Sequence, residues 1–94
     1  SPVQQQVQVS RDDKSTTLSL DVPGLASEQL KLSIDGAVIR LESAEGASRQ
    51  VKRAWELDHE IDAAASKAKL EHGVLTLTLV KLEPQSKATE LAIE

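Results

Sequence analysis

Hydrophobic and polar residues alternate along most of this chain, and such period-2 alternation predicts β-strands rather than helices. Each strand would then bury one face and expose the other. The apolar faces of the most regular segments are Leu18, Leu20 and Val22, then Val51, Trp55 and Leu57, and finally Leu75, Leu77 and Leu79.

Two β-hairpins are predicted from turn residues that interrupt the alternation. In "QLKLSIDGAVIRLE", an apolar face of Leu30, Leu32 and Ile34 runs into Asp35-Gly36, a pair typical of the centre of a type I′ turn. In "AKLEHGVLTLTLVK", His72-Gly73 fits a tight turn between two strands, since histidine is enriched among non-glycine residues at positive φ.

The remaining segments are weaker. Val3, Val7 and Val9 lie among glutamines and predict an edge strand, while "DHEIDAAASKAK" predicts a turn or a short helical stretch. About seven short strands with frequent turn signals are typical of an all-β, immunoglobulin-like β-sandwich. We expect one domain over residues 1–81 and a C-terminal extension over 82–94, ending in Leu91-Ala92-Ile93.

Composition narrows the possible functions. Trp55 is the only aromatic residue, so the core must consist of Leu, Val, Ile and Ala. A net charge of −4 without a basic tract argues against nucleic acid as a partner. No apolar run reaches the roughly 18 residues that span a membrane, and no leader is evident, so we expect a soluble, cytoplasmic protein. A start at Ser-Pro without Met suggests that the chain is trimmed at its N-terminus.

The best candidate for chemistry is the acidic cluster of Asp58, Glu60 and Asp62 around His59, which could bind a metal or serve as a general base. Its spacing matches no zinc motif, so a solvated loop is the favoured interpretation. With no cysteine and no Gly-x-Ser-x-Gly elbow, we expect neither an enzyme nor a cofactor.

Two features need a partner to explain them. Arg53 falls in the apolar register beside Trp55, so it should meet a carboxylate within the fold or across an interface, unless its head reaches the rim. Leu91 and Ile93 follow a polar segment and would fit two pockets of a neighbouring groove, unless they are merely the chain end.

Together these segments resemble the α-crystallin domain of the small heat shock proteins, the Hsp20 family. The resemblance extends from about Ser15 to the C-terminus, with the elements in the family's order. It is carried by "DVPGLASEQLKLSIDGAVIRLES", by Arg53 in "KRAWELDHEID", by Ala68, Gly73, Val74 and Leu75 with His72 in the usual Asn position, and by Leu91-Ala92-Ile93.

The resemblance implies an ATP-independent holdase that binds unfolding proteins and associates with itself. Arg53 would lie at a dimer interface. The tail motif would dock between two strands, in a groove formed by Leu30, Leu32, Ile34, Ala68 and Leu70. Only the short loop of residues 43–50 separates the Asp-Gly hairpin from the arginine strand, which leaves a strand-swapped dimer, an edge-to-edge dimer and a monomer open. The N-terminal arm that members of the family often carry would be absent or truncated in this chain.

Two other functions remain possible. A CS-type co-chaperone or adaptor sandwich would bind a folded partner without forming an oligomer, and the short loop favours it while Arg53 and the tail oppose it. A small enzyme would need a tightly bound metal or convergent catalytic groups.

Overall fold

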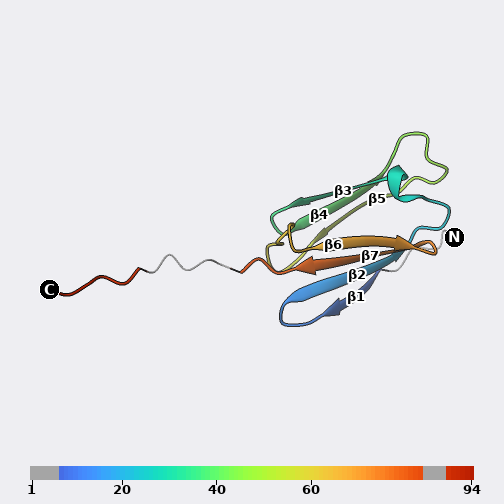
Figure 1. The fold of residues 1–94 in the computed structure, drawn as a ribbon. Helices are drawn as coiled ribbons and strands as arrows, with labels where there is room; N and C mark the ends of the chain where they lie inside the picture. Colours follow the sequence, from blue (N-terminus) through green and yellow to red (C-terminus); the bar gives the residue numbers. More distant parts are fainter. Residues whose placement is uncertain (1–6, 84–88) are drawn as a thin grey trace.

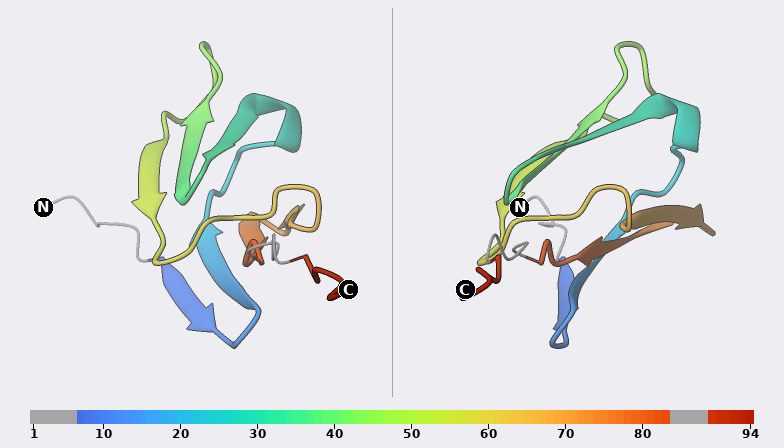
Figure 2. Two further views of the ribbon diagram at one scale, coloured as in Figure 1. Left: turned by 90° about the vertical axis from the view of Figure 1, so that its left-hand side faces the viewer. Right: turned by 60° about the vertical axis from the view of Figure 1, so that its left-hand side comes forward.

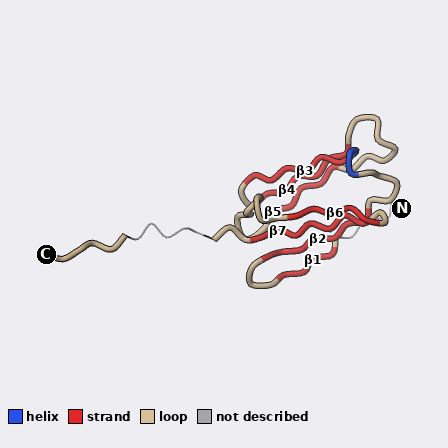
Figure 3. The backbone as a smooth tube through the Cα atoms, in the orientation of Figure 1, coloured by secondary structure: helices blue, strands red, loops and turns tan. Residues whose placement is uncertain are grey.

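The computed structural model describes residues 7–83 and 89–94 (Figure 1). Nearly all of its regular structure is β-strand, with one short 3-10 helix, drawn blue in Figure 3. The elements are β1 (Gln8–Arg11), β2 (Ser15–Asp21), η1 (Ser27–Gln29), β3 (Leu30–Asp35), β4 (Val38–Ser43), β5 (Lys52–Glu56), β6 (Lys67–Glu71) and β7 (Val74–Val80).

The strands form two antiparallel sheets in two layers (Figure 2). One sheet has the order β1-β2-β7-β6 and the other has the order β3-β4-β5. The segment after β5 crosses from the three-stranded sheet to the four-stranded sheet before β6 begins (Figure 2). The predicted all-β sandwich of about seven strands is therefore confirmed.

The core lies between the sheets and is built from aliphatic side chains. Because side chains alternate between the two faces of a strand, the inward positions of β2, β4 and β7 supply most of it. Trp55 is only partly buried. The buried apolar residues are Leu18, Leu20, Val22, Leu25, Ile39, Leu41, Val51, Ile61, Leu75, Leu77 and Leu79.

The turn between β6 and β7 is the one predicted. His72 and Gly73 both have positive φ, at 52° and 76°, as a type I′ turn requires. The prediction for the β3–β4 turn was wrong by one residue. Asp35 pairs with Val38, so Gly36 and Ala37 are central, and in this turn only Gly36 has positive φ, the pattern of a type II′ turn.

Other differences are local. The short 3-10 helix at Ser27–Gln29 was not predicted. Residues 63–65 form a turn, one of the two structures predicted for their segment, with Ser66 N–H donating to the carbonyl of Asp62 at 3.0 Å. Val3 lies outside the described residues, so the predicted edge strand is seen only as β1. The division at residue 81 remains a prediction.

The turn between β1 and β2 is closed by Asp12. Its carboxylate accepts hydrogen bonds from the backbone N–H groups of Lys14 and Ser15, at 2.7 and 2.8 Å. These two donors hold the pKa of the Asp12 carboxyl below its usual value, because they favour the charged form. Asp12 therefore acts as a turn residue.

Candidate binding groove and strand edges

An apolar groove lies between β3 and β6, where the two sheets come together at one side of the sandwich. It consists of two shallow hollows of about 130 and 170 Å³. The residues lining them are Ser27, Leu30, Leu32, Ile34, Leu41, Ala63, Ser66, Lys67, Ala68, Leu70, Leu75 and Leu79.

All five residues predicted for the groove line it. Leu30, Leu32 and Ile34 come from β3, while Ala68 and Leu70 come from β6. Leu32 and Ala68 contact both hollows, so they lie at the middle of the groove. The two ends of the groove, at Ser27 and at Ala63 with Ser66, were not predicted, because these residues come from the 3-10 helix and a turn that alternation does not reveal.

The backbone of β3 also faces this side. Ala44 N–H donates to the carbonyl of Gln29 at 2.7 Å. Because hydrogen-bond direction alternates along an antiparallel strand, Leu30, Leu32 and Ile34 direct their own N–H and C=O groups away from β4. The groove therefore offers apolar side-chain contacts beside backbone groups on the free edge of β3, a combination suited to an extended peptide.

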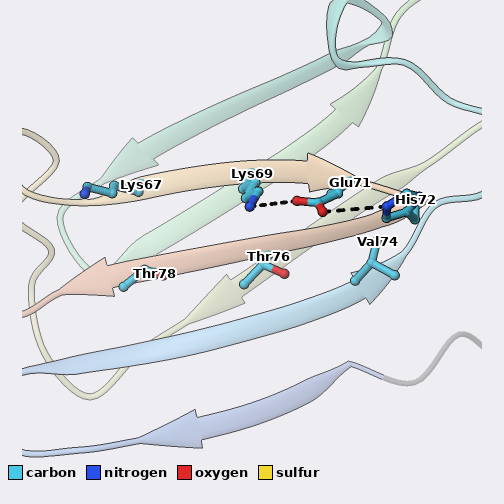
Figure 4. Close-up of a pocket in the computed structure, with 7 residues that line it drawn as sticks. All are labelled: Lys67, Lys69, Glu71, His72, Val74, Thr76 and Thr78. Carbon is cyan, nitrogen blue, oxygen red and sulfur yellow. Dashed lines mark ion pairs between the residues drawn. The ribbon is translucent and has the colours of Figure 1, made fainter.

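A larger hollow of about 490 Å³ lies on the opposite face of β6 and β7, and charged residues and threonines make up most of its lining (Figure 4). Its Lys69 and Glu71 form an ion pair at 2.7 Å, and His72 lies 3.6 Å from the other oxygen of Glu71. All three side chains are mostly exposed, and exposed ion pairs contribute little free energy. The smaller apolar groove is the better candidate for binding.

Arg53 is half-buried on β5, and its guanidinium lies over the ring of Trp55 at 5.4 Å from the centroid. Within the described residues, the ion pairs found do not include Arg53. Inside the fold its contact is thus an aromatic face rather than a carboxylate. A carboxylate partner across an interface, and Arg53 as an interface residue, remain predictions.

Replacing Arg53 by alanine should lower the free energy of unfolding by about 0.5 to 2 kcal/mol, through loss of the cation–π contact and of the packed stem. Chemical denaturation would measure this loss, with Arg40→Ala as the control because Arg40 is exposed on β4. Equal effects of the two substitutions would show that the contact with Trp55 contributes nothing.

A solvated loop was predicted around His59, but in the structure the His59 ring is partly buried and hydrogen-bonded to β2. Its Nδ1 lies 2.8 Å from the carbonyl of Glu60, which can only accept, so Nδ1 carries the proton. In the neutral imidazole, Nε2 then accepts from the hydroxyl of Thr16 on β2, at 3.0 Å. Thr16 is 2 % exposed, so His59 satisfies a buried hydroxyl.

Replacing His59 by alanine should destabilise the fold by about 1 to 3 kcal/mol, because the Thr16 hydroxyl loses its acceptor while it stays buried. Thermal and chemical unfolding of His59→Ala, Thr16→Val and the double variant would measure the coupling. We expect the double variant to be less destabilised than the sum of the single variants. Strictly additive effects would rule out the pairing.

The rest of the acidic cluster does not form a metal centre. Asp58 faces Arg11 at 3.8 Å, with both side chains exposed, and Asp62 accepts a hydrogen bond from Ala65 N–H. Among residues 7–83 and 89–94, no three His, Cys, Asp or Glu side chains gather where they could hold a metal ion.

The two tail residues are exposed. Leu91 and Ile93 are 91 % and 98 % exposed, and the stretch that carries them lies away from the sandwich (Figure 1). Their side chains therefore make little contact with the groove of this copy.

In the part of the chain that the structure describes, no helix is long and apolar enough to cross a membrane.

Comparison with known proteins identifies the family. The model of the Hsp20/alpha crystallin family matches residues 8–94. The "26.7 kDa heat shock protein, chloroplastic" of Oryza sativa subsp. japonica is 30% identical over 104 residues, covering 92% of this chain. This chain thus belongs to the Hsp20/α-crystallin family, and it spans 43% of the length of the rice protein.

Solved structures agree on the fold. Heat shock protein 16.0 from Schizosaccharomyces pombe has a TM-score of 0.73 at 20% identity, covering 99% of this chain and 100% of that one. A small heat-shock protein from Xylella fastidiosa has a TM-score of 0.74 at 18% identity, covering 98% of each chain. The crystal structure of the Xylella protein reveals a distinct high order structure for that protein.

Proposed function

We propose that this chain is an ATP-independent holdase chaperone, which binds unfolding proteins and prevents their aggregation. The observation that carries the proposal is the apolar groove between β3 and β6, on a member of the Hsp20 family. A groove of this kind can bind extended, partly apolar segments of many sequences, because backbone edges and aliphatic contacts discriminate little.

The tail motif is the natural competitor for the same groove. Leu91 and Ile93 are two residues apart, so in an extended segment they point to the same side, and the groove offers two neighbouring hollows. Burying each side chain would contribute roughly 1.5 to 3 kcal/mol, reduced by the entropy of ordering the tail. Docking of this strength is weak enough to exchange with a client.

The proposed function implies two kinds of partner, unfolding proteins and further copies of this chain. Self-association would join the tail of one copy to the groove of another, and Arg53 would lie at a dimer contact. A cytoplasmic location remains a prediction. The rice relative carries the word chloroplastic in its own name.

The adaptor function is disfavoured. A CS-type adaptor would need neither the exposed Leu91-Ala92-Ile93 motif nor an apolar groove beside an open strand edge. Family membership also favours the chaperone. An enzymatic function has no supporting observation.

Light scattering from a heat-labile protein would test the holdase. The client is warmed with this chain at near-equal molar ratio, without nucleotide, beside an unrelated protein of similar size as the control. Suppressed scattering is the expected result. Scattering equal to the control would argue for the adaptor.

A further inference from the structure

Lys67 lies between the apolar groove and the larger hollow on the outer face of β6 and β7, and it borders both of them. Among the described residues that line the groove, Lys67 alone carries a charge. Lys67 is exposed, and the ion pairs found within the described residues do not include it. A ligand in the groove would therefore have an unpaired ammonium group beside it.

The outward side chains of the four-stranded sheet form rows across the strands, and one of these rows is satisfied within the fold. In that row Lys69 is opposite Thr76, and Thr76 is opposite Ser19. Lys69 pairs with Glu71 at 2.7 Å, and the hydroxyls of Thr76 and Ser19 share a hydrogen bond at 3.4 Å. The polar groups of this row thus already have partners.

The neighbouring row differs. Lys67 is opposite Thr78, and Thr78 is opposite Thr17. Figure 4 shows Lys67 and Thr78 at the end of the hollow that lies away from His72. The side-chain hydrogen bonds found within residues 7–83 and 89–94 do not include Thr17 or Thr78. An ammonium group and two hydroxyls can all donate to a carboxylate, and hydrogen bonds to an ionised acceptor are the stronger kind.

We propose that the groove prefers client segments in which carboxylates lie next to the apolar residues, and that Lys67 and Thr78 bind such a carboxylate at the rim. This inference rests on the proposed holdase function and adds the chemical class of the bound segment. Two apolar side chains would fill the hollows of the groove. A neighbouring aspartate or glutamate points the other way along an extended segment, so it would reach the rim at β6.

The chain's own tail has this composition. Glu90 and Glu94 lie on either side of Leu91-Ala92-Ile93. With Leu91 and Ile93 pointing into the groove, the two glutamates would point away from its floor, because side chains alternate along an extended segment. The proposed competitor of the clients thus carries carboxylates at the positions that the rim would favour.

The overall charge of the chain acts in the opposite direction. A net charge of −4 disfavours the approach of an acidic segment, so a preference for carboxylates has to come from local groups. An exposed ion pair contributes little and is screened by salt. We therefore expect a preference of roughly two- to fivefold in affinity at low salt, which declines as salt is added.

Two synthetic peptides test the preference. Both contain Leu-Ala-Ile, flanked on both sides by glutamates in one peptide and by glutamines in the other, so that the direction of binding does not matter. Fluorescence anisotropy would measure their dissociation constants. The full chain with Leu91→Ala and Ile93→Ala is used, so that its own tail does not compete. The glutamate peptide should bind roughly two- to fivefold more tightly.

Four substitutions in this chain locate the source of the preference. Lys67→Gln should abolish the difference between the peptides. Lys52→Gln is the matched control, because it removes the same charge from an exposed position on β5, in the other sheet and at the opposite edge from β3. Thr78→Val should reduce the difference, whereas Thr76→Val, in the satisfied row, should leave it unchanged.

The outcomes separate this inference from the proposed function. Loss of the preference in Lys67→Gln together with its retention in Lys52→Gln would support the inference. Equal affinities for the two peptides, or a preference that survives Lys67→Gln, would overturn it while the groove still binds apolar segments. Binding of neither peptide would overturn both the inference and the groove as the binding site.

Discussion

Replacing Leu91 and Ile93 together by alanine should reduce the mass of the assembly in solution to that of the dimer or monomer. Both side chains are almost fully exposed, so the substitutions cost the fold nothing. They remove most of the apolar area available for docking, roughly 1.5 to 3 kcal/mol per side chain at full burial. Light scattering coupled to size-exclusion chromatography would measure the mass.

The matched control is Thr89→Ala with Glu90→Ala, which changes two exposed polar residues of the same tail. This variant should keep the wild-type mass. If the Leu91 and Ile93 double variant also kept the wild-type mass, the tail would have no part in assembly.

Placing a carboxylate in the groove should have an effect of similar size. Ala68 is exposed at the surface yet lines both hollows, so Ala68→Glu adds a charge to the middle of the groove without disturbing the core. An apolar side chain of the tail or of a client would then have to dock against an ionised group, which is costly to desolvate. We expect loss of large assemblies and weaker suppression of client aggregation.

Ser33→Glu is the control for Ala68→Glu. It adds the same charge at an exposed position on the outer face of β3, away from the groove. Unfolding should show similar stabilities for both variants, so that any difference in assembly reflects the groove. Wild-type assembly and wild-type suppression by Ala68→Glu would exclude the groove as the docking surface.

Alternation predicted the two layers well, because it fixes which side of each strand is apolar. It did not fix the centre of the β3–β4 turn. Moving the centre of the turn by one residue changes the cross-strand partner of each residue by two positions. Inward-facing residues therefore still pair with inward-facing residues, and the alternation is the same for both registers. In the structure Ile34 pairs with Ile39 and Leu32 pairs with Leu41, and Gly36 alone takes the positive φ.

The groove residues could be predicted from the sequence, whereas the hydrogen bond of His59 could not. Alternation indicated the apolar face of Leu30, Leu32 and Ile34, whereas the family resemblance alone pointed to Ala68 and Leu70. His59 is bonded to Thr16, which is 43 residues earlier in the chain, and no local pattern connects the two. The sequence placed Arg53 beside Trp55 but suggested a carboxylate as its partner. In the structure the guanidinium of Arg53 lies over the ring of Trp55 instead.

The most direct test is whether this chain binds a permanently unfolded protein at the groove. A reduced and carboxymethylated protein, which cannot refold, is added to the isotopically labelled chain without nucleotide, and the backbone amide signals are recorded. We expect the signals of Leu30, Leu32, Ala68 and Leu70 to shift or broaden most. Unchanged signals throughout, with no soluble complex, would contradict the assignment as a holdase.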